Sequence, residues 1–383
     1  MWTVILLIPL ILILLHHGHS LLPRILYHRS FHKIHVARNI VNFRQFNVRT
    51  LGERLLIRAL PNRRLVAAFG IKNAFTTTDP LVYKRFARYA TSLINRVNAD
   101  NEEWRQLLLL GQDTLQRYMS SGPEHQLGTQ EQRLHLTSTV RILCFVVVLH
   151  FLFPGVESVD LEAARSATDD INRLWMQSKD ASVPVSEREQ DLLVTKIRQM
   201  LPINGQLYDL SGLEEQSNPL NIILPAFETL WRVVLLTYVH IAFRGSPAAL
   251  PANQANPPGR LPLYQDEYAA CFKVIAADIE SLHRDPSIWG HNAHDFFLPR
   301  MAQGLTQEQK DAYMPFGLAP HLCPAANKFG ERMISMLLGL LLHGLGSSGT
   351  GATIEYGDAK LDGDLHAPLP TGREDAEGWY ITL

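Results

Sequence analysis

The chain has 383 residues, 46% of them hydrophobic, and a formal net charge of −1 at pH 7. This length allows one large core or two ordinary domains, and the near-zero charge, with no basic block beyond the N-terminal region, argues against a nucleic-acid partner. The three cysteines, Cys144, Cys271 and Cys323, are far apart and odd in number. Such a set is not a disulfide framework and is typical of a reducing compartment.

Residues 1–22 predict a membrane anchor. Val4 to Leu15 is apolar apart from one proline, although a spanning helix needs about 20 residues. Every charged residue from Arg24 to Arg49 is cationic, and the first acid is Glu53. Because cationic flanks stay on the cytosolic side, we expect a single-pass anchor in the endoplasmic reticulum membrane, a basic linker over 23–50 and a cytosolic body. The alternative is a secretory signal peptide, but neither its charged start nor its cleavage site is clear.

The sequence beyond the predicted anchor indicates mostly helices. Asp79 and Pro80 indicate a helix start, because aspartate is a good N-cap and proline fits the first helical position. Apolar spacing or length predicts further helices over Val140–Phe153, Leu161–Trp175, Glu187–Leu201 and Phe329–Leu345. The first of these is too short for a second membrane span and indicates a buried core helix.

Two segments predict loops, and the end of the chain predicts strands. Gly245 to Pro262 is rich in proline, and Gly344 to Gly351 is rich in glycine and serine, a composition that interrupts regular structure. The polar tail that follows indicates a short hairpin ending at Trp379–Ile381.

The segment from Asn218 to Arg232 predicts an apolar helix with an acid and an alcohol inside it. Glu228 is followed by Thr229, and Pro225 lies three residues before the acid. Proline frees a backbone carbonyl and bends a helix, and a bent helix with a carboxyl and a hydroxyl can hold water and relay protons. The alternative is an ordinary helix in which Glu228 pairs with Arg232 at i,i+4.

Cys323 lies between a Gly/Pro loop and the apolar run that begins at Phe329. A lone thiolate at the mouth of a helix can be a metal ligand, because the exposed N–H groups there favour the anion. The alternative is a structural cysteine buried at the start of a core helix.

The segment from Tyr313 to Ala325 resembles the haem-binding loop of cytochromes P450, with the pattern Phe-Gly-x-Gly-x-(Arg/His)-x-Cys-x-(Gly/Ala). The matching positions are Phe316, Gly317, His321, Cys323 and Ala325, whereas Ala319 stands where the family usually has glycine. The resemblance implies haem b, with Cys323 as the axial thiolate ligand of the iron. It also implies Phe316 as a cofactor contact and His321 as a propionate contact. A thiolate ligand favours O–O cleavage at the iron.

Three other segments extend the resemblance. Glu228 and Thr229 resemble the acid–alcohol pair of the oxygen-activating helix, (Ala/Gly)-Gly-x-(Asp/Glu)-Thr, and would deliver protons. Residues 276–300 resemble the segment before the cysteine loop, and residues 73–80 resemble filamentous-fungal members. The implied fold is mainly α with small β-sheets, a P450 haem domain over residues 51–383.

One part of the family pattern is missing. Between Arg244 and Ile275 the family has a helix carrying Glu-x-x-Arg, which braces the cysteine loop, but Gly245 to Asn256 cannot form it. Glu228 and Arg232 have the wrong spacing to replace it. Either the gene model omits coding sequence here or the chain is a degenerate member with an incomplete fold.

The resemblance implies an oxidoreductase: a membrane-anchored haem-thiolate monooxygenase that inserts one oxygen atom from O2 into a small apolar substrate. Electrons would come from NADPH through NADPH–cytochrome P450 reductase, and the fungal likeness implies secondary-metabolite biosynthesis. The alternative is a degenerate, non-catalytic relative with little or no haem. A third, remote alternative is a membrane-tethered helical adaptor.

Overall fold

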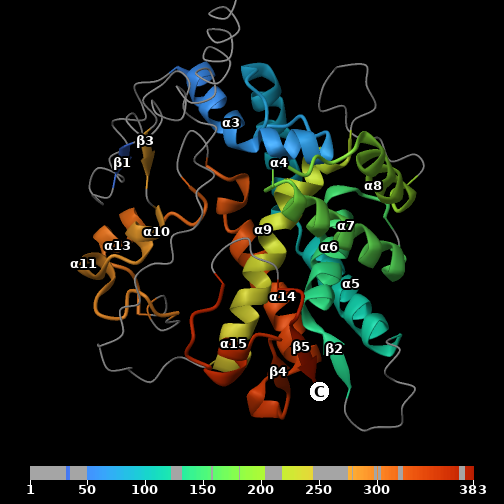
Figure 1. Ribbon diagram of the computed structural model, residues 1–383, viewed down its shortest axis with the longest axis vertical. Helices are drawn as coiled ribbons and strands as arrows, with labels where there is room; N and C mark the ends of the chain where they lie inside the picture. Colours follow the sequence, from blue (N-terminus) through green and yellow to red (C-terminus); the bar gives the residue numbers. More distant parts are fainter. Residues whose placement is uncertain are drawn as a thin grey trace, which may run out of the picture.

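The protein is described by a computed structural model that covers residues 32–34, 50–121, 132–156, 158–180, 182–202, 218–244, 275–277, 279–296, 300, 303–317, 322–370 and 376–383. The longer helices are α3 (Leu51–Phe69), α4 (Pro80–Ala99), α5 (Asn101–Ser120), α6 (Leu136–Leu152), α7 (Leu161–Gln177), α8 (Glu187–Gln199), α9 (Leu220–Val239) and α14 (Phe329–Leu345). The fold is mainly α with small β-sheets, as predicted (Figure 1).

Short elements complete the described chain. They are the α-helices α10 (Ile279–His283), α11 (Pro286–Trp289), α13 (Gln307–Ala312) and α15 (Ala359–Gly363), the π-helix η2 (His240–Arg244) and the 3-10 turns η3 (Pro324–Ala326) and η4 (Ser348–Thr350). The strands are β1 (His32–Ile34), β2 (Arg133–His135), β3 (Ile275–Ala277), β4 (Thr353–Glu355) and β5 (Tyr380–Thr382). β1 and β3 are parallel, and β5 pairs antiparallel with both β2 and β4.

Local sequence signals placed most of the long helices. Asp79 accepts a hydrogen bond from Leu81 N–H at 2.7 Å, and Pro80 is the first residue of α4. The segment predicted over Phe329–Leu345 is α14. The predicted loop from Gly344 begins later than expected, because α14 continues to Leu345 and η4 follows.

The tail contains an antiparallel pair of strands, β4 and β5, with Ile354 opposite Ile381. Residues 356–379, which include α15, separate the two strands, so they do not form the short hairpin that was predicted. A third strand, β2, pairs with the other edge of β5, and Leu134 lies opposite Ile381. The sequence did not indicate this strand, because three residues are too few to show an alternating pattern.

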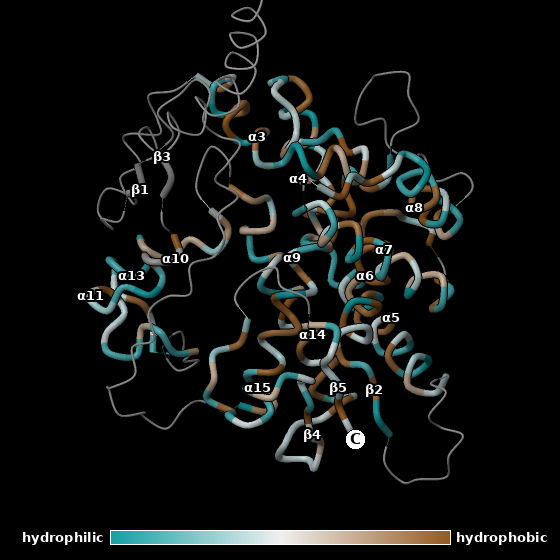
Figure 2. The backbone as a smooth tube through the Cα atoms, viewed as in Figure 1, coloured by the Kyte–Doolittle hydropathy of each residue, from teal (hydrophilic) through white to brown (hydrophobic). Residues whose placement is uncertain are grey.

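The core is built around α6, in which every residue except His150 is buried. Helices α5, α7 and α9 pack against it, and α14 packs against α5 and α9 (Figures 1 and 2). Two glycines allow the close approach of α5 and α14. A Cβ on Gly111 would lie 2.4 Å from Leu340 Cδ1, and one on Gly344 would lie 2.4 Å from Leu115 Cδ2. The prediction of a buried core helix over Val140–Phe153 is confirmed.

Pro225 frees a carbonyl in α9, and the structure shows what uses it. Proline at position i removes the hydrogen bond to the carbonyl at i−4, which here belongs to Asn221. Asn221 O instead accepts a hydrogen bond from Asn73 Nδ2 at 2.9 Å, and Asn221 Oδ1 accepts one from Lys72 N at 2.7 Å. The freed carbonyl therefore ties the loop before α4 to α9.

A smaller hydrophobic cluster lies beside the main helical body, formed by α10, α11, α13 and the residues that follow them (Figure 1). Its buried residues are Leu282, Ile288, Trp289, Ala293, Ala312 and Met314. One contact between this cluster's segment and the main body is the stacking of Phe296 on His240, with ring centroids 4.7 Å apart and planes 15° apart.

Two helices of the described chain are long and apolar enough to cross a membrane, Leu220–Arg244 and Phe329–Thr350. The first includes α9, most of which is buried in the protein. The predicted anchor over residues 1–22 lies outside the described residues, and so does nearly all of the linker over 23–50.

His240 should make the protein sensitive to acid. Its pKa is lowered to about 4, mainly by burial and also by the charge of Arg244. An unfolded histidine titrates near about 6.5, so between these two values the unfolded chain binds a proton that the folded chain does not. The free energy of unfolding must therefore fall as the pH falls through this window. The loss from this residue is at most about 3 kcal/mol.

The variant His240→Phe keeps a ring against Phe296 and removes the titrating group. Urea unfolding at about pH 7.5 and about pH 4.5 should show a smaller loss of stability in the variant than in the parent. Equal losses in the two proteins would contradict this prediction. The pKa of His283 is also lowered by burial. His283 contributes equally to the loss of stability in the parent and in the variant, so it does not affect the comparison.

Candidate functional site

Cys323 is exposed and lies at the start of the turn η3, just before α14. Its N–H donates to Phe316 O at 3.0 Å, and its carbonyl accepts from Ala326 N–H at 3.0 Å. The structure therefore brings two of the predicted site residues, Phe316 and Cys323, together. His321 lies outside the described residues.

Phe316 also contacts α14, and a glycine makes this contact possible. A Cβ on Gly330 would lie 2.8 Å from two carbons of the Phe316 ring and 3.1 Å from Ala325 O. The ring therefore occupies the space that a side chain at position 330 would need. This packing fixes the loop before Cys323 against the first turn of α14.

The segment after Cys323 is held by α4 and α5. Asn98 Nδ2 donates to Asn327 O at 3.0 Å, and Arg332 Nη2 donates to Asn101 Oδ1 at 3.2 Å. The Arg332 guanidinium lies 4.4 Å from the centre of the Trp104 ring. The sequence had suggested no residue that ties the cysteine loop in place, and these contacts supply such ties.

The surroundings of Cys323 differ from those expected in the sequence analysis, where the N–H groups at the N-terminus of a helix would favour the thiolate. The first residue of α14 is Phe329, so Cys323 precedes a 3-10 turn and not the helix itself. Partial desolvation of the sulfur raises the pKa of the thiol. A hydrogen bond from the backbone of Ala325 and the charge of Arg58 act in the opposite direction. A coordinated metal ion deprotonates a thiol outright, so this pKa is compatible with ligation.

Arg58 on α3 is a cation near the cysteine that the sequence did not single out. Its guanidinium lies 4.2 Å from the centre of the Phe75 ring, and burial lowers its pKa. Its position could not be read from the sequence, because α3 and the cysteine loop are far apart along the chain.

Glu228 and Thr229 are neighbours in sequence but lie on different faces of α9. Glu228 is buried, with 5% of its surface exposed, whereas Thr229 is exposed. Glu228 Oε2 contacts Arg232 Nε at 3.3 Å. The i,i+4 pair that was the alternative interpretation is therefore present, and the proton-delivery role of the two residues stays a prediction.

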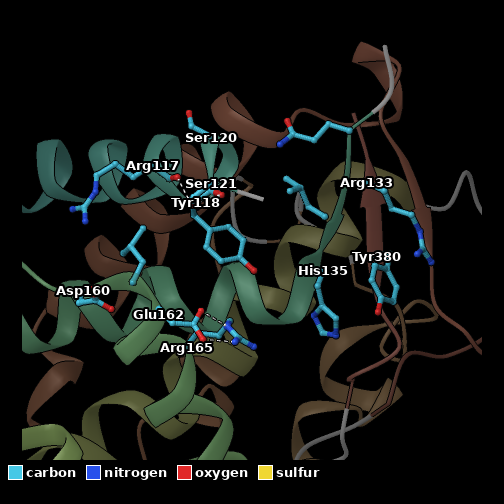
Figure 3. Close-up of a pocket in the computed structure, with 13 residues that line it drawn as sticks. Arg117, Tyr118, Ser120, Ser121, Arg133, His135, Asp160, Glu162, Arg165 and Tyr380 are labelled. Carbon is cyan, nitrogen blue, oxygen red and sulfur yellow. Dashed lines mark hydrogen bonds and ion pairs between the residues drawn. The ribbon is translucent and has the colours of Figure 1, made fainter. Parts of the chain in front are cut away.

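A groove of about 670 Å³ lies between the end of α5, the strand β2 and the start of α7 (Figure 3). Tyr118, His135 and Tyr380 are among its lining residues. None of the predicted site residues lines it. Its arginines already have acidic partners: Arg133 with Glu355 at 2.8 Å, and Arg117 with Asp113 at 3.3 Å.

The residues at Cys323 fit a haem ligand in their chemistry. The sulfur belongs to an exposed residue, it accepts a backbone hydrogen bond, and Arg58 supplies a nearby positive charge. Among the described residues, no group of three or more His, Cys, Asp and Glu side chains could hold a metal ion by itself. Cys323 would hold the iron, with Phe316 packing behind the loop.

Comparisons with known proteins point to cytochromes P450. The chain is 41% identical over 66 residues to cytochrome P450 714A2 of Arabidopsis thaliana, which covers 17% of this chain and 12% of the relative. It is 31% identical over 119 residues to cytochrome P450 CYP82D47 of Panax ginseng, which covers 28% of this chain and 31% of the relative. A Caenorhabditis elegans relative, cytochrome P450 CYP13A3, is 46% identical over 50 residues, or 13% of this chain and 10% of the relative.

The matched segments thus span less than a third of the length of these curated relatives. No protein-family model and no solved structure matches the chain. The helical fold with small sheets and the partial homology agree with a P450-like protein, and the names of the relatives indicate oxidoreductases of that class. The fungal type, the substrate and the pathway are not shown by these relatives.

Proposed function

We propose that this chain is a haem-thiolate monooxygenase that inserts one oxygen atom from O2 into a small apolar substrate, in secondary-metabolite biosynthesis. The observation that carries the proposal is the loop around Cys323. The backbone of the exposed Cys323 is hydrogen-bonded to Phe316, whose ring packs against Gly330 in the first turn of α14. Both residues lie in a segment whose residue order resembles the haem-binding loop.

The roles of the residues follow from this proposal. Cys323 would hold the iron of haem b through its thiolate, and Phe316 and His321 would contact the cofactor, His321 at a propionate. The haem iron supplies oxygen activation when it is bound. Thr229, exposed on α9, and Glu228, buried on another face of the same helix, would hold and move a proton on the substrate side. Electrons come from NADPH through NADPH–cytochrome P450 reductase.

The experiment is the absorption spectrum of the reduced, carbon-monoxide-bound protein. We expect the band of a haem-thiolate, and we expect Cys323→Ala to abolish it, because the ligand is lost. Cys144→Ala is the matched control, since Cys144 is wholly buried in α6 and should leave the band unchanged. A band that survives Cys323→Ala and disappears in Cys144→Ala contradicts the assignment. A parent protein without the band supports the degenerate, non-catalytic alternative.

We also propose that residues 1–22 anchor the protein in the endoplasmic reticulum membrane with the body in the cytosol. The cationic residues after the apolar start support this orientation. Protease added to sealed microsomes should digest the body, whereas complete protection of the body would contradict the proposed topology.

A further inference from the structure

A chain of polar contacts connects the C-terminal segment to α9 through the interior of the main body. Glu377 Oε1 accepts a hydrogen bond from Asn172 Nδ2 on α7 at 3.0 Å. Asn172 Oδ1 accepts one from Arg232 Nη2 on α9 at 3.2 Å. Arg232 Nε in turn contacts Glu228 Oε2 at 3.3 Å. The acid of the acid–alcohol pair is thus linked to a residue near the end of the chain.

Glu377 also faces a second buried arginine. Arg141 on α6 is 1% exposed, and it donates to both carboxylate oxygens of Glu377, at 2.5 and 3.1 Å. Asp169 lies 3.0 Å from the same guanidinium, and His135 Nε2 lies 3.7 Å from Glu377. The charged and titratable groups of this network are therefore Glu228, Arg232, Arg141, Asp169, Glu377, His135 and Arg165, which lies 3.7 Å from Asp169.

The contact between Arg232 and Glu228 is not the strongest that the two side chains could make. An arginine fork can grip a carboxylate with two parallel hydrogen bonds of about 2.7–2.9 Å. Here the contact through Nε is longer, at 3.3 Å, and Nη2 is directed to Asn172. The guanidinium lies 4.1 Å from the centre of the Trp231 ring, beside a cavity of about 10 Å³ that Arg232 helps to line. The Nε–Nη2 edge of the guanidinium, which could contact both oxygens of Glu228, is instead divided between Glu228 and Asn172.

We propose that Asn172 and Glu377 are positioning residues that direct Arg232 away from a two-point contact with Glu228, so that the Glu228 carboxyl can gain and lose a proton. The step involves only a proton: Glu228 takes it from water and returns it, while Arg232 stays charged. What the proton is used for rests on the proposed function, but the effect of Asn172 and Glu377 on Glu228 does not.

The test is the titration of Glu228 in the full chain, followed by NMR of protein carrying ¹³C-labelled glutamate. The Glu228 signal is the one lost in Glu228→Gln. In Glu377→Gln, the neutral amide oxygen accepts from Asn172 more weakly than the carboxylate does, so Asn172 is held less firmly and Arg232 can close on Glu228. The substitution also removes a negative charge. We therefore expect the midpoint of the Glu228 titration to move to lower pH by roughly one unit. Asn172→Leu should move it in the same direction without changing any charge, and it replaces Glu377→Gln if that variant fails to fold.

Glu355→Gln is the matched control. Glu355 is also a glutamate paired with an arginine, Arg133 at 2.8 Å, but it lies on the exposed strand β4, so its loss should leave the Glu228 midpoint unchanged. If Glu377 has only a structural role, Glu377→Gln should lower the stability of the protein and leave the midpoint of the Glu228 titration unchanged. That result overturns the inference. A shift of the midpoint to higher pH also overturns it. The titration needs no haem, so its outcome is separate from the Cys323 spectrum.

Discussion

Arg141→Ala is expected to lower the free energy of unfolding by about 3–5 kcal/mol, a large part of the total stability of a protein domain. The guanidinium is buried in the middle of α6 and is held by two acids, Glu377 and Asp169. Removing it leaves a cavity beside the buried helix α6 and removes the ion pairs that link this helix to Glu377 and Asp169. Equilibrium unfolding in urea measures the change.

Arg165→Ala is the control for this prediction. Arg165 also pairs with Asp169, at 3.7 Å, but 45% of its side chain is exposed, and surface pairs contribute at most about 1 kcal/mol. Arg141→Met should cost less than Arg141→Ala, because methionine fills more of the space that the arginine leaves. If Arg141→Ala and Arg165→Ala destabilise the protein equally, the buried network does not hold the C-terminal segment.

Gly330→Ala is expected to destabilise the protein by about 1–3 kcal/mol and to lower its haem content several-fold, because the new methyl group overlaps the ring of Phe316. The ring or the backbone at Ala325 must then move. Both belong to the loop that presents Cys323, so the thiol moves with them. Urea unfolding gives the stability, and the reduced, carbon-monoxide-bound spectrum gives the haem content.

Gly339→Ala, in the same helix, is the matched control. A Cβ at Gly339 would meet nothing within 4 Å, and alanine stabilises a helix interior by roughly 0.5–1 kcal/mol relative to glycine. The two substitutions should therefore have opposite effects on stability. A stabilising effect of Gly330→Ala would show that Phe316 does not pack against α14 as described.

Local chemistry in the sequence predicted much of the fold. Asp79 and Pro80 placed the start of α4, and the apolar run from Phe329 placed α14, because caps and apolar periodicity act within a few residues. The order of residue types around Cys323 indicated the cysteine loop for the same reason. The brace segment between Arg244 and Ile275 lies almost wholly outside the described residues, and its absence stays a prediction.

The contacts that position the site could not be predicted in this way. The sequence allowed two interpretations of Glu228. It could act with Thr229 as an acid–alcohol pair, or it could form an ion pair with Arg232 one turn later, and the spacing of the residues agreed with both. The structure shows the pair with Arg232, because the packing of α9 against α6 and α14 buries one part of the helix surface and leaves Thr229 on another. The role of either residue in proton transfer is still a proposal.

The sequence by itself determined the start of α4, the extent of α14 and which cysteine is set in the haem-like loop, since each depends on neighbouring residues. Only the tertiary structure decided which distant groups meet: Phe316 against Gly330, Asn73 on the carbonyl that Pro225 frees, and Glu377 on Arg141. These contacts join residues far apart along the chain, and their formation depends on how whole helices pack. A pattern of nearby residues carries no information on that packing.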